Sequence, residues 1–188
     1  MIKYKKLIIK KIMQFFIIIL LLFSTLINAK STGESTGFKL PRFVSTKFDE
    51  SNLRIGAGKD YPIKLTYIVK NFPLEIIDEH ELWRKIIDIN GNHGWMKGSL
   101  LKGNRYGIIK TSHNSPAQIY NKPRGKIVGK IENRNIVKLN KCFDQWCHIK
   151  FNKYKGWINK INVWGVYAEE QFNMPFYHFF LKLSWKFF

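Results

Sequence analysis

The chain has 188 residues, of which 32 are Lys or Arg and 13 are Asp or Glu, so its formal net charge is +19. This length excludes more than one or two domains. The basic excess indicates an anionic partner: nucleic acid, an anionic surface or a polyanionic polymer. The lysines are spread along the whole chain, however, and no single segment concentrates them.

Residues 1–29 have the layout of a secretory signal peptide. An apolar run, Ile12–Phe23, follows a basic start without acids and precedes a more polar stretch that ends at Ala29. We expect export to the periplasm or cell envelope, which removes nucleic acid as a partner. The alternative is an uncleaved anchor in the inner membrane, although the run is shorter than the roughly 20 residues of a bilayer span.

The rest of the chain divides into four further regions. Residues 30–42 are small, polar and glycine-containing, and are expected to form a linker. Two segments built on one plan follow, 43–104 and 105–167, and an aromatic tail covers 168–188. The alignment of the two segments pairs Leu53 with Ile119, Trp83 with Trp146, and Gly94–Trp95 with Gly156–Trp157. A repeat of this length is typical of two tandem small domains.

Both segments carry β signals. The stretches "LTYIVK", "PLEIID" and "WRKIIDI" are rich in β-branched and aromatic residues, and Asn90–Gly91 is a hairpin signal because both residues tolerate positive φ. No sustained helical period occurs between Phe43 and Gly165. About five short strands in each segment of about 60 residues predict an all-β fold of small closed barrels.

Two glycines, Gly56 and Gly58, lie in "SNLRIGAGKDYP". Neither a dinucleotide loop nor a P-loop fits, because the third glycine, the Lys-Ser/Thr pair and the following helix are all missing. We expect these glycines to provide positive φ at a turn, and Asn52 and Asp60 to bond nearby backbone groups. Arg54 is expected to pair with Asp60 or Asp49, or to lie over an aromatic ring.

The motifs "NLRIGAGKDYP", "LWRKI", "GNHGWM" and "GSLL" resemble those of the bacterial SH3 domain family of exported proteins. The second segment resembles the companion repeat of two-copy members at Trp146–Ile149, Gly156–Ile158 and Trp164–Tyr167. The resemblance extends from about Phe43 to Tyr167 and implies two tandem SH3-like barrels. Ala57 stands where many members carry proline, which leaves the turn less rigid.

The aromatic residues support two interpretations. Trp83, Trp95, Trp146 and Trp157 recur in register, which favours packing in or at the rim of the barrels; the alternative is a groove that stacks on glycan or peptide. The groove candidates join aromatic side chains to one arginine: Arg54, Tyr61, Tyr67, Trp83 and, at the Arg54 position of the second repeat, Tyr120. The residues expected to be structural are Asn52, Gly56, Gly58, Trp95, Trp146 and Trp157.

Cys142 and Cys147 are expected to form a structural disulfide if the compartment is oxidising, and two small buried thiols are the alternative. His148 alone cannot complete a zinc site with them. The sequence also contains no catalytic set of Ser, His and Asp or of paired carboxylates. We therefore expect no metal, no cofactor and no enzymatic activity.

The tail places Phe176, Phe179, Phe180 and Leu183 at helical spacing, which fits either a helix lying on a membrane surface or packing across the barrels. The function expected is a non-catalytic envelope module that binds cell-wall peptidoglycan or an envelope protein segment. The alternative is a scaffold or regulatory subunit of an envelope enzyme or transporter.

Overall fold

The computed structural model describes residue 14, residues 32–112 and residues 115–174. The expected signal peptide, apart from residue 14, and the aromatic stripe of the tail lie outside these residues. No helix within the described part of the chain is both long and apolar enough to cross a membrane.

Fourteen β-strands and two 3-10 turns form the described fold, which is all-β as expected. The first repeat contains β1 (Arg42–Thr46), β2 (Ser51–Arg54), β3 (Ile63–Tyr67), β4 (Pro73–His80), β5 (Trp83–Ile87), β6 (His93–Lys97), η2 (Gly98–Leu100) and β7 (Leu101–Lys102). The second repeat contains β8 (Tyr106–Ile109), β9 (Ala117–Tyr120), β10 (Ile127–Ile131), β11 (Ile136–Phe143), β12 (Trp146–Phe151), β13 (Tyr154–Asn159), η4 (Lys160–Asn162) and β14 (Val163–Trp164).

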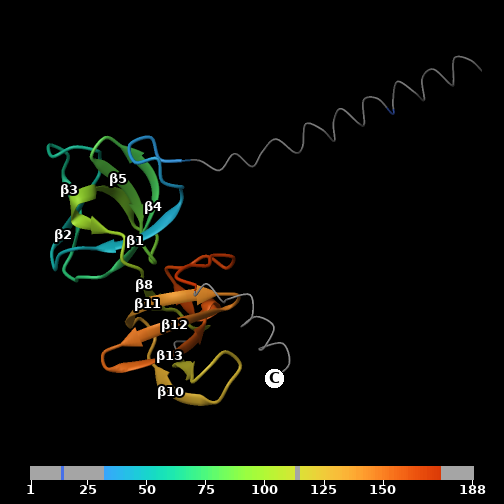
Figure 1. Cartoon of the computed structure of the whole chain (residues 1–188). Coiled ribbons are helices and arrows are strands. Elements are labelled where there is room, and N and C mark those ends of the chain that lie inside the picture. The colour runs from blue at the N-terminus through green and yellow to red at the C-terminus, as the bar shows by residue number, and fades with distance from the viewer. Residues whose placement is uncertain (1–13, 15–31, 113–114, 175–188) are drawn as a thin grey trace, which may run out of the picture. The chain divides into compact units, whose positions relative to one another are not determined.

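Each repeat is one seven-stranded antiparallel sheet that curls around its own core (Figure 1). The strand orders are β3-β2-β6-β5-β4-β1-β7 and β10-β9-β13-β12-β11-β8-β14, so the two sheets have the same topology. The internal repeat predicted from the sequence is therefore a repeat of the fold.

Strand register confirms the predicted alignment of the two repeats. Arg54 lies opposite Trp95 in the first repeat, and Tyr120 lies opposite Trp157 in the second. The glycine before each tryptophan lets two strands approach closely. A Cβ atom at Gly94 would lie 2.9 Å from Leu53 Cγ, and one at Gly156 would lie 2.4 Å from Ile119 Cγ2.

Alternating strand residues enclose one apolar core in each repeat. The fully buried members of the first core include Leu53, Leu74, Ile86 and Met96. Those of the second include Ile109, Val137, Ile158 and both cysteines. The outward-facing residues of the same strands are left to form the surface on which a ligand would bind.

The β4–β5 hairpin and its counterpart β11–β12 are locked at the same cross-strand position by different chemistry. Glu79 lies opposite Arg84 in the first repeat. Cys142 lies opposite Cys147 in the second, and the two are joined by a disulfide with Cα atoms 4.1 Å apart. The structure thus contains the expected bridge.

The Glu79 carboxylate lies in a buried cluster. It accepts hydrogen bonds from Thr36 N at 2.9 Å, Thr36 Oγ1 at 2.8 Å and Arg42 Nη2 at 2.5 Å, and Arg84 Nε is 3.5 Å away. Burial raises the pKa of Glu79, but these hydrogen bonds and the charges of Arg42 and Arg84 outweigh it and hold that pKa below 4.5. Gly33 lies against the carboxylate, where a Cβ atom would clash at 2.3 Å. Residues 33–42, expected as a linker, are therefore tied to the first repeat.

The segment after β14 is bound to the second repeat in a comparable way. Phe172 exchanges two backbone hydrogen bonds with Cys142, at 3.2 and 3.1 Å. Arg105 forms an ion pair with Glu170, and its guanidinium lies 4.8 Å from the centre of the Phe172 ring. The buried ammonium of Lys160 donates to the carbonyl oxygens of Ala168 and Glu170.

Aromatic contacts join the two repeats. The Phe43 ring on β1 lies 5.1 Å from the Trp164 ring and 4.8 Å from the Tyr167 ring, between centroids. Tyr167 Oη donates a hydrogen bond of 2.7 Å to Glu75 Oε1 on β4. The end of the second repeat is thus packed against β1 and β4 of the first.

Candidate functional site

The candidate site of the first repeat lies on the outer face of β2, β6 and β5. Arg54, Trp95 and Lys85 follow one another across these three strands, because Trp95 pairs with both of the others. Their neighbours Leu53 and Met96 point inward and are fully buried. Strict alternation along each strand therefore places a tryptophan between two cations.

Tyr61 lies at the edge of this face, in the loop between β2 and β3, and is 49% exposed. Arg54 Nη1 donates a hydrogen bond of 2.6 Å to the carbonyl oxygen of Tyr61. Arg54 therefore holds the loop through its backbone, rather than pairing with one of the aspartates expected as its partner.

The expected role of the two loop glycines is wrong. The glycines with positive φ among the described residues are Gly37, Gly91 and Gly165, so neither Gly56 nor Gly58 needs a left-handed backbone. They instead make room for the Tyr61 ring. A Cβ atom at Gly56 would lie 2.5 Å from Tyr61 Cδ1, and one at Gly58 would lie 3.1 Å from Tyr61 Cδ2.

Asn52 also has a different partner from the one expected. Its Oδ1 accepts a hydrogen bond of 2.7 Å from Thr66 Oγ1 on the neighbouring strand β3. The side chain therefore ties β2 to β3, which supports its expected structural role through a cross-strand bond and not a local turn.

Trp83 begins β5, where it lies opposite both His80 and Lys97, and it is half-buried. The His80 and Trp95 ring centroids are 6.4 Å apart. His80, Lys85 and Lys97 were not predicted as neighbours of these tryptophans. The period of two along β5 and β6 was the signal that would have found the lysines.

Tyr67, a groove candidate, does not belong to this surface. Its side chain is only 6% exposed, and its Oη donates to Asp88 Oδ2 at 3.1 Å. Burial, followed by the charge and hydrogen bond of Asp88, raises the pKa of Tyr67. Phe72 packs on the ring at 5.2 Å. Tyr67 closes one end of the first core.

The second repeat has a more aromatic version of the same face. The Tyr120 and Trp146 rings meet edge to face at 5.2 Å, and Tyr120 takes the cross-strand place of Arg54, as predicted. Trp157 is 8% exposed, because the residues around it cover its ring. The Phe143 and His148 ring centroids lie 5.3 and 5.2 Å from that of Trp157, and the Lys141 ammonium lies 5.3 Å from it.

His148 carries little positive charge at neutral pH. Burial, and then the charges of Lys141 and Lys155, lower the pKa of its imidazole. Within the described ranges, no group of three or more His, Cys, Asp or Glu side chains is placed to hold a metal ion. The two faces offer stacking surfaces, cations and hydrogen-bond donors, which are the chemistry of binding.

Comparison with protein families gives a match to the bacterial SH3 domain at residues 47–103 and again at residues 115–165. These two matches cover more than half of the chain, and each contains six of the seven strands of one sheet. The chain therefore belongs to the bacterial SH3 domain family, and the resemblance found in its motifs is confirmed.

A search of curated proteins finds no match. Among solved structures, the chain is similar to NlpC1 from Trichomonas vaginalis, with 14% identity and a TM-score of 0.32. The match covers 70% of this chain and 48% of that one, so the chain spans about half the length of the solved structure.

Proposed function

We propose that this protein is a non-catalytic binding module of the cell envelope that holds peptidoglycan through the aromatic–basic faces of its two repeats. Bacterial SH3 domains are typically cell-wall binding modules, and only such domains were matched in this chain. The observation that carries the proposal is the row Arg54–Trp95–Lys85, with Tyr61 and Trp83 beside it.

The chemistry of this face suits the cell wall. The exposed Tyr61 ring and the half-buried Trp83 and Trp95 rings offer flat apolar surfaces that stack on sugar rings and extended peptides. Arginine and lysine attract carboxylates and phosphates, which wall polymers carry in large numbers. A net charge of +19 would add a long-range attraction to such a polyanion.

An envelope location is part of the proposal. Disulfides persist in oxidising compartments and are rare in the cytosol, and Cys142–Cys147 is such a bond. The layout of residues 1–29 supports export to the periplasm or retention at the inner membrane.

Co-sedimentation of the full chain with purified peptidoglycan sacculi tests the proposal. We expect saturable pelleting, and a loss of at least about tenfold in affinity when Tyr61→Ala and Trp83→Ala are combined, because two stacking surfaces are removed. Phe48→Ala is the matched control, since Phe48 is an equally exposed aromatic residue of the first repeat. A wild-type chain that does not pellet, and that crosslinks instead to an envelope enzyme or transporter, would favour a scaffold or regulatory subunit.

A further inference from the structure

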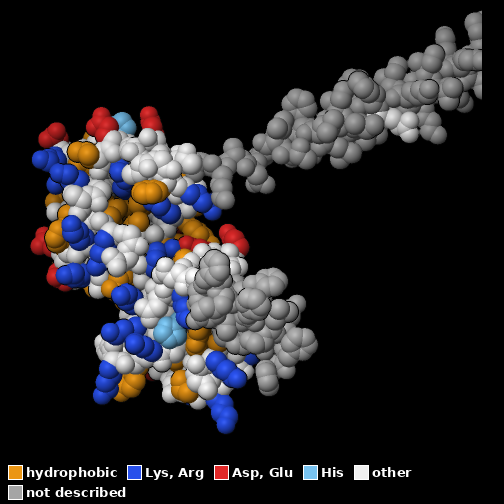
Figure 2. All heavy atoms as spheres, in the orientation of Figure 1, with side chains coloured by type: hydrophobic (Ala, Val, Ile, Leu, Met, Phe, Trp, Pro, Cys, Tyr) orange, Lys and Arg blue, Asp and Glu red, His pale blue; other side chains and the backbone are white. Residues whose placement is uncertain are grey.

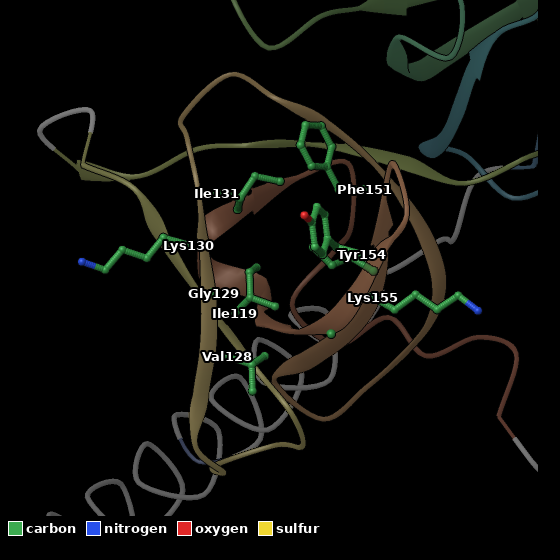
Figure 3. Close-up of a pocket in the computed structure, with 10 residues that line it drawn as sticks. Ile119, Val128, Gly129, Lys130, Ile131, Phe151, Tyr154 and Lys155 are labelled. Carbon is green, nitrogen blue, oxygen red and sulfur yellow. The ribbon is translucent and has the colours of Figure 1, made fainter.

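The second repeat contains an apolar cavity of about 260 Å³ at one end of its core, away from the aromatic–basic face. Figure 3 shows Ile119, Ile131, Phe151 and Tyr154 directed into this space from β9, β10, β12 and β13. Lys130 and Lys155 lie at its rim with their ammonium groups directed away from it (Figure 3). The walls are apolar and the rim is cationic.

Comparison with the first repeat explains the open space. Leu65 pairs with Leu53 and packs on the first core, whereas the corresponding partner of Ile119 is Gly129. A Cβ atom at Gly129 would meet no other atom within 4 Å. A side chain that fills the first repeat is therefore missing at this position of the second.

The polar pair that closes one end of the first core is also replaced by apolar residues in the second repeat. Tyr67 and Asp88 are hydrogen bonded at the end of the first core. The same register positions hold Ile131 and Phe151 in the second repeat, where both line the cavity. The second repeat has thus exchanged a closed polar end for an open apolar one.

A strand edge borders the cavity. β10 is the terminal strand of its sheet, and among the described residues it pairs with β9 alone. After a register shift, Gly129–Ile131 runs regularly beside β9, so its outer side presents backbone groups that an added strand can pair with.

The two hairpins that line the cavity carry charge of one sign. The β9–β10 hairpin, residues 117–131, and the β12–β13 hairpin, residues 146–159, contain no Asp or Glu. Their basic residues are Lys122, Arg124, Lys126, Lys130, Lys150, Lys153 and Lys155. On the face shown in Figure 2, Lys and Arg side chains lie beside apolar ones over this repeat. The surroundings therefore complement an acidic partner.

We propose that the second repeat binds an extended acidic peptide that pairs with the edge of β10 and inserts one large apolar side chain into the cavity. Edge pairing supplies backbone hydrogen bonds, and the cavity selects the side chain. The volume is ample for an aromatic ring, because an apolar cavity of roughly 150 Å³ already admits benzene. This site lies outside the aromatic–basic faces and does not depend on glycan binding by them.

The probe is a set of short fluorescein-labelled peptides in which one central residue is flanked by glutamates at alternate positions. The central residue is Phe, Tyr, Trp, Leu or Ala, and a second set carries lysines in place of the glutamates. Fluorescence anisotropy is measured with the full chain purified from the envelope of an expression host. We expect the acidic peptides with a large apolar centre to bind about tenfold or more tightly than their Ala and lysine analogues.

The decisive variant is Gly129→Leu, which restores the side chain of the first repeat at a position where a Cβ atom meets no other atom within 4 Å. We expect it to abolish peptide binding while leaving sedimentation with sacculi unchanged. The double variant Lys130→Glu with Lys155→Glu, both exposed, should weaken binding of the acidic peptides, and Lys110→Glu, an exposed lysine beyond β8, should not. The Tyr61→Ala and Trp83→Ala variant should bind the peptides as the wild type does.

Several results would overturn the proposal. One is the absence of saturable binding by every apolar-centred acidic peptide, and another is unchanged binding by Gly129→Leu. Tighter peptide binding after truncation at Met174 would assign the cavity to the chain's own residues 175–188. Self-association that Gly129→Leu abolishes would assign it to a second copy. Binding of anionic phospholipid vesicles that Gly129→Leu abolishes, with no peptide binding, would assign it to an acyl chain.

Discussion

The two repeats share one backbone plan but differ in what locks their central hairpins. At one cross-strand position the first repeat has Glu79 opposite Arg84, and the second has Cys142 opposite Cys147. Both positions lie next to the core, since Glu79 is 4% exposed and both cysteines are fully buried. A single site in the fold therefore accepts either a charged cluster or a covalent bond.

The buried Glu79 cluster and the Cys142–Cys147 disulfide need different support from the rest of the chain. A buried carboxylate is stable only when its charge and lone pairs are compensated. Glu79 is therefore bound by Thr36, which precedes β1, and by Arg42, which begins it. A disulfide needs only its two cysteines, and Phe172 pairs with Cys142 through two backbone hydrogen bonds. The β4–β5 hairpin of the first repeat thus depends on residues 33–42, which lie outside it, for the stability of Glu79.

The largest effect is expected from Glu79→Ala. It leaves the guanidinium groups of Arg42 and Arg84 without their buried partner, so the free energy of unfolding should fall by about 3–5 kcal/mol. Urea denaturation of the full chain, with hydrogen exchange read separately for each repeat, measures this loss. Glu34→Ala, an exposed glutamate of the same segment, should change little. Equal loss of hydrogen-exchange protection in both repeats would show that the Glu79 cluster does not stabilise the first repeat separately from the second.

The double variant Cys142→Ala with Cys147→Ala should have the next largest effect. The bond closes a short loop of five residues in sequence, so its removal should lower the free energy of unfolding by about 2 kcal/mol. We expect lost exchange protection in the second repeat and unchanged protection in the first. A reducing agent should reproduce the loss in the wild type but have no effect on the variant. Destabilisation of the first repeat alone would contradict the comparison.

Tyr67→Phe should cost less, about 1 kcal/mol, because it removes one buried hydrogen bond while Asp88 keeps those from Asn90 and Asn92. Thermal unfolding measures the change. Tyr61→Phe is the control, since the Tyr61 ring is half exposed. An equal effect of both substitutions would remove the distinction between the closed end of the first core and the open end of the second.

Acid should gradually weaken the Glu79 cluster of the first repeat. The pKa of Glu79 is lower in the folded chain than its ordinary 4.5, so its contribution to stability is complete above that pH and is lost as the pH falls through the lower folded value. We expect Glu79→Gln to flatten the dependence of unfolding free energy on pH below 4.5. The Cys142–Cys147 bond does not titrate, so removing it should leave that dependence unchanged.

The repeat, the disulfide and the family could be predicted because each depends on residues close in sequence or on ordered motifs. The placement of Tyr120 at the Arg54 position followed from the alignment of Leu53 with Ile119. Tyr67 could not be placed, because its burial depends on Asp88, which lies 21 residues away. The cavity at Gly129 was equally inaccessible, since it reflects the summed volumes of side chains from four strands.

The Glu79 cluster escaped sequence analysis for a related reason. Thr36 and Arg42 lie 43 and 37 residues before Glu79, in a stretch whose small polar composition is typical of a linker. The composition of residues 33–42 predicts only how stiff they are. Their contribution to stability comes from contact with the buried carboxylate of Glu79, which is distant in sequence. The Gly56–Gly58 motif shows the same limit, because the ring that requires those glycines is visible only in the folded loop.

The contact of Phe43 with Trp164 and Tyr167 bears on whether either repeat can be excised. Phe43 is 8% exposed, and rings from the far end of the second repeat help to cover it. Excision of either repeat would leave a bare aromatic patch and, at Glu75, a carboxylate without its tyrosine. The pair, and not either repeat alone, is therefore the smallest unit that keeps this surface covered.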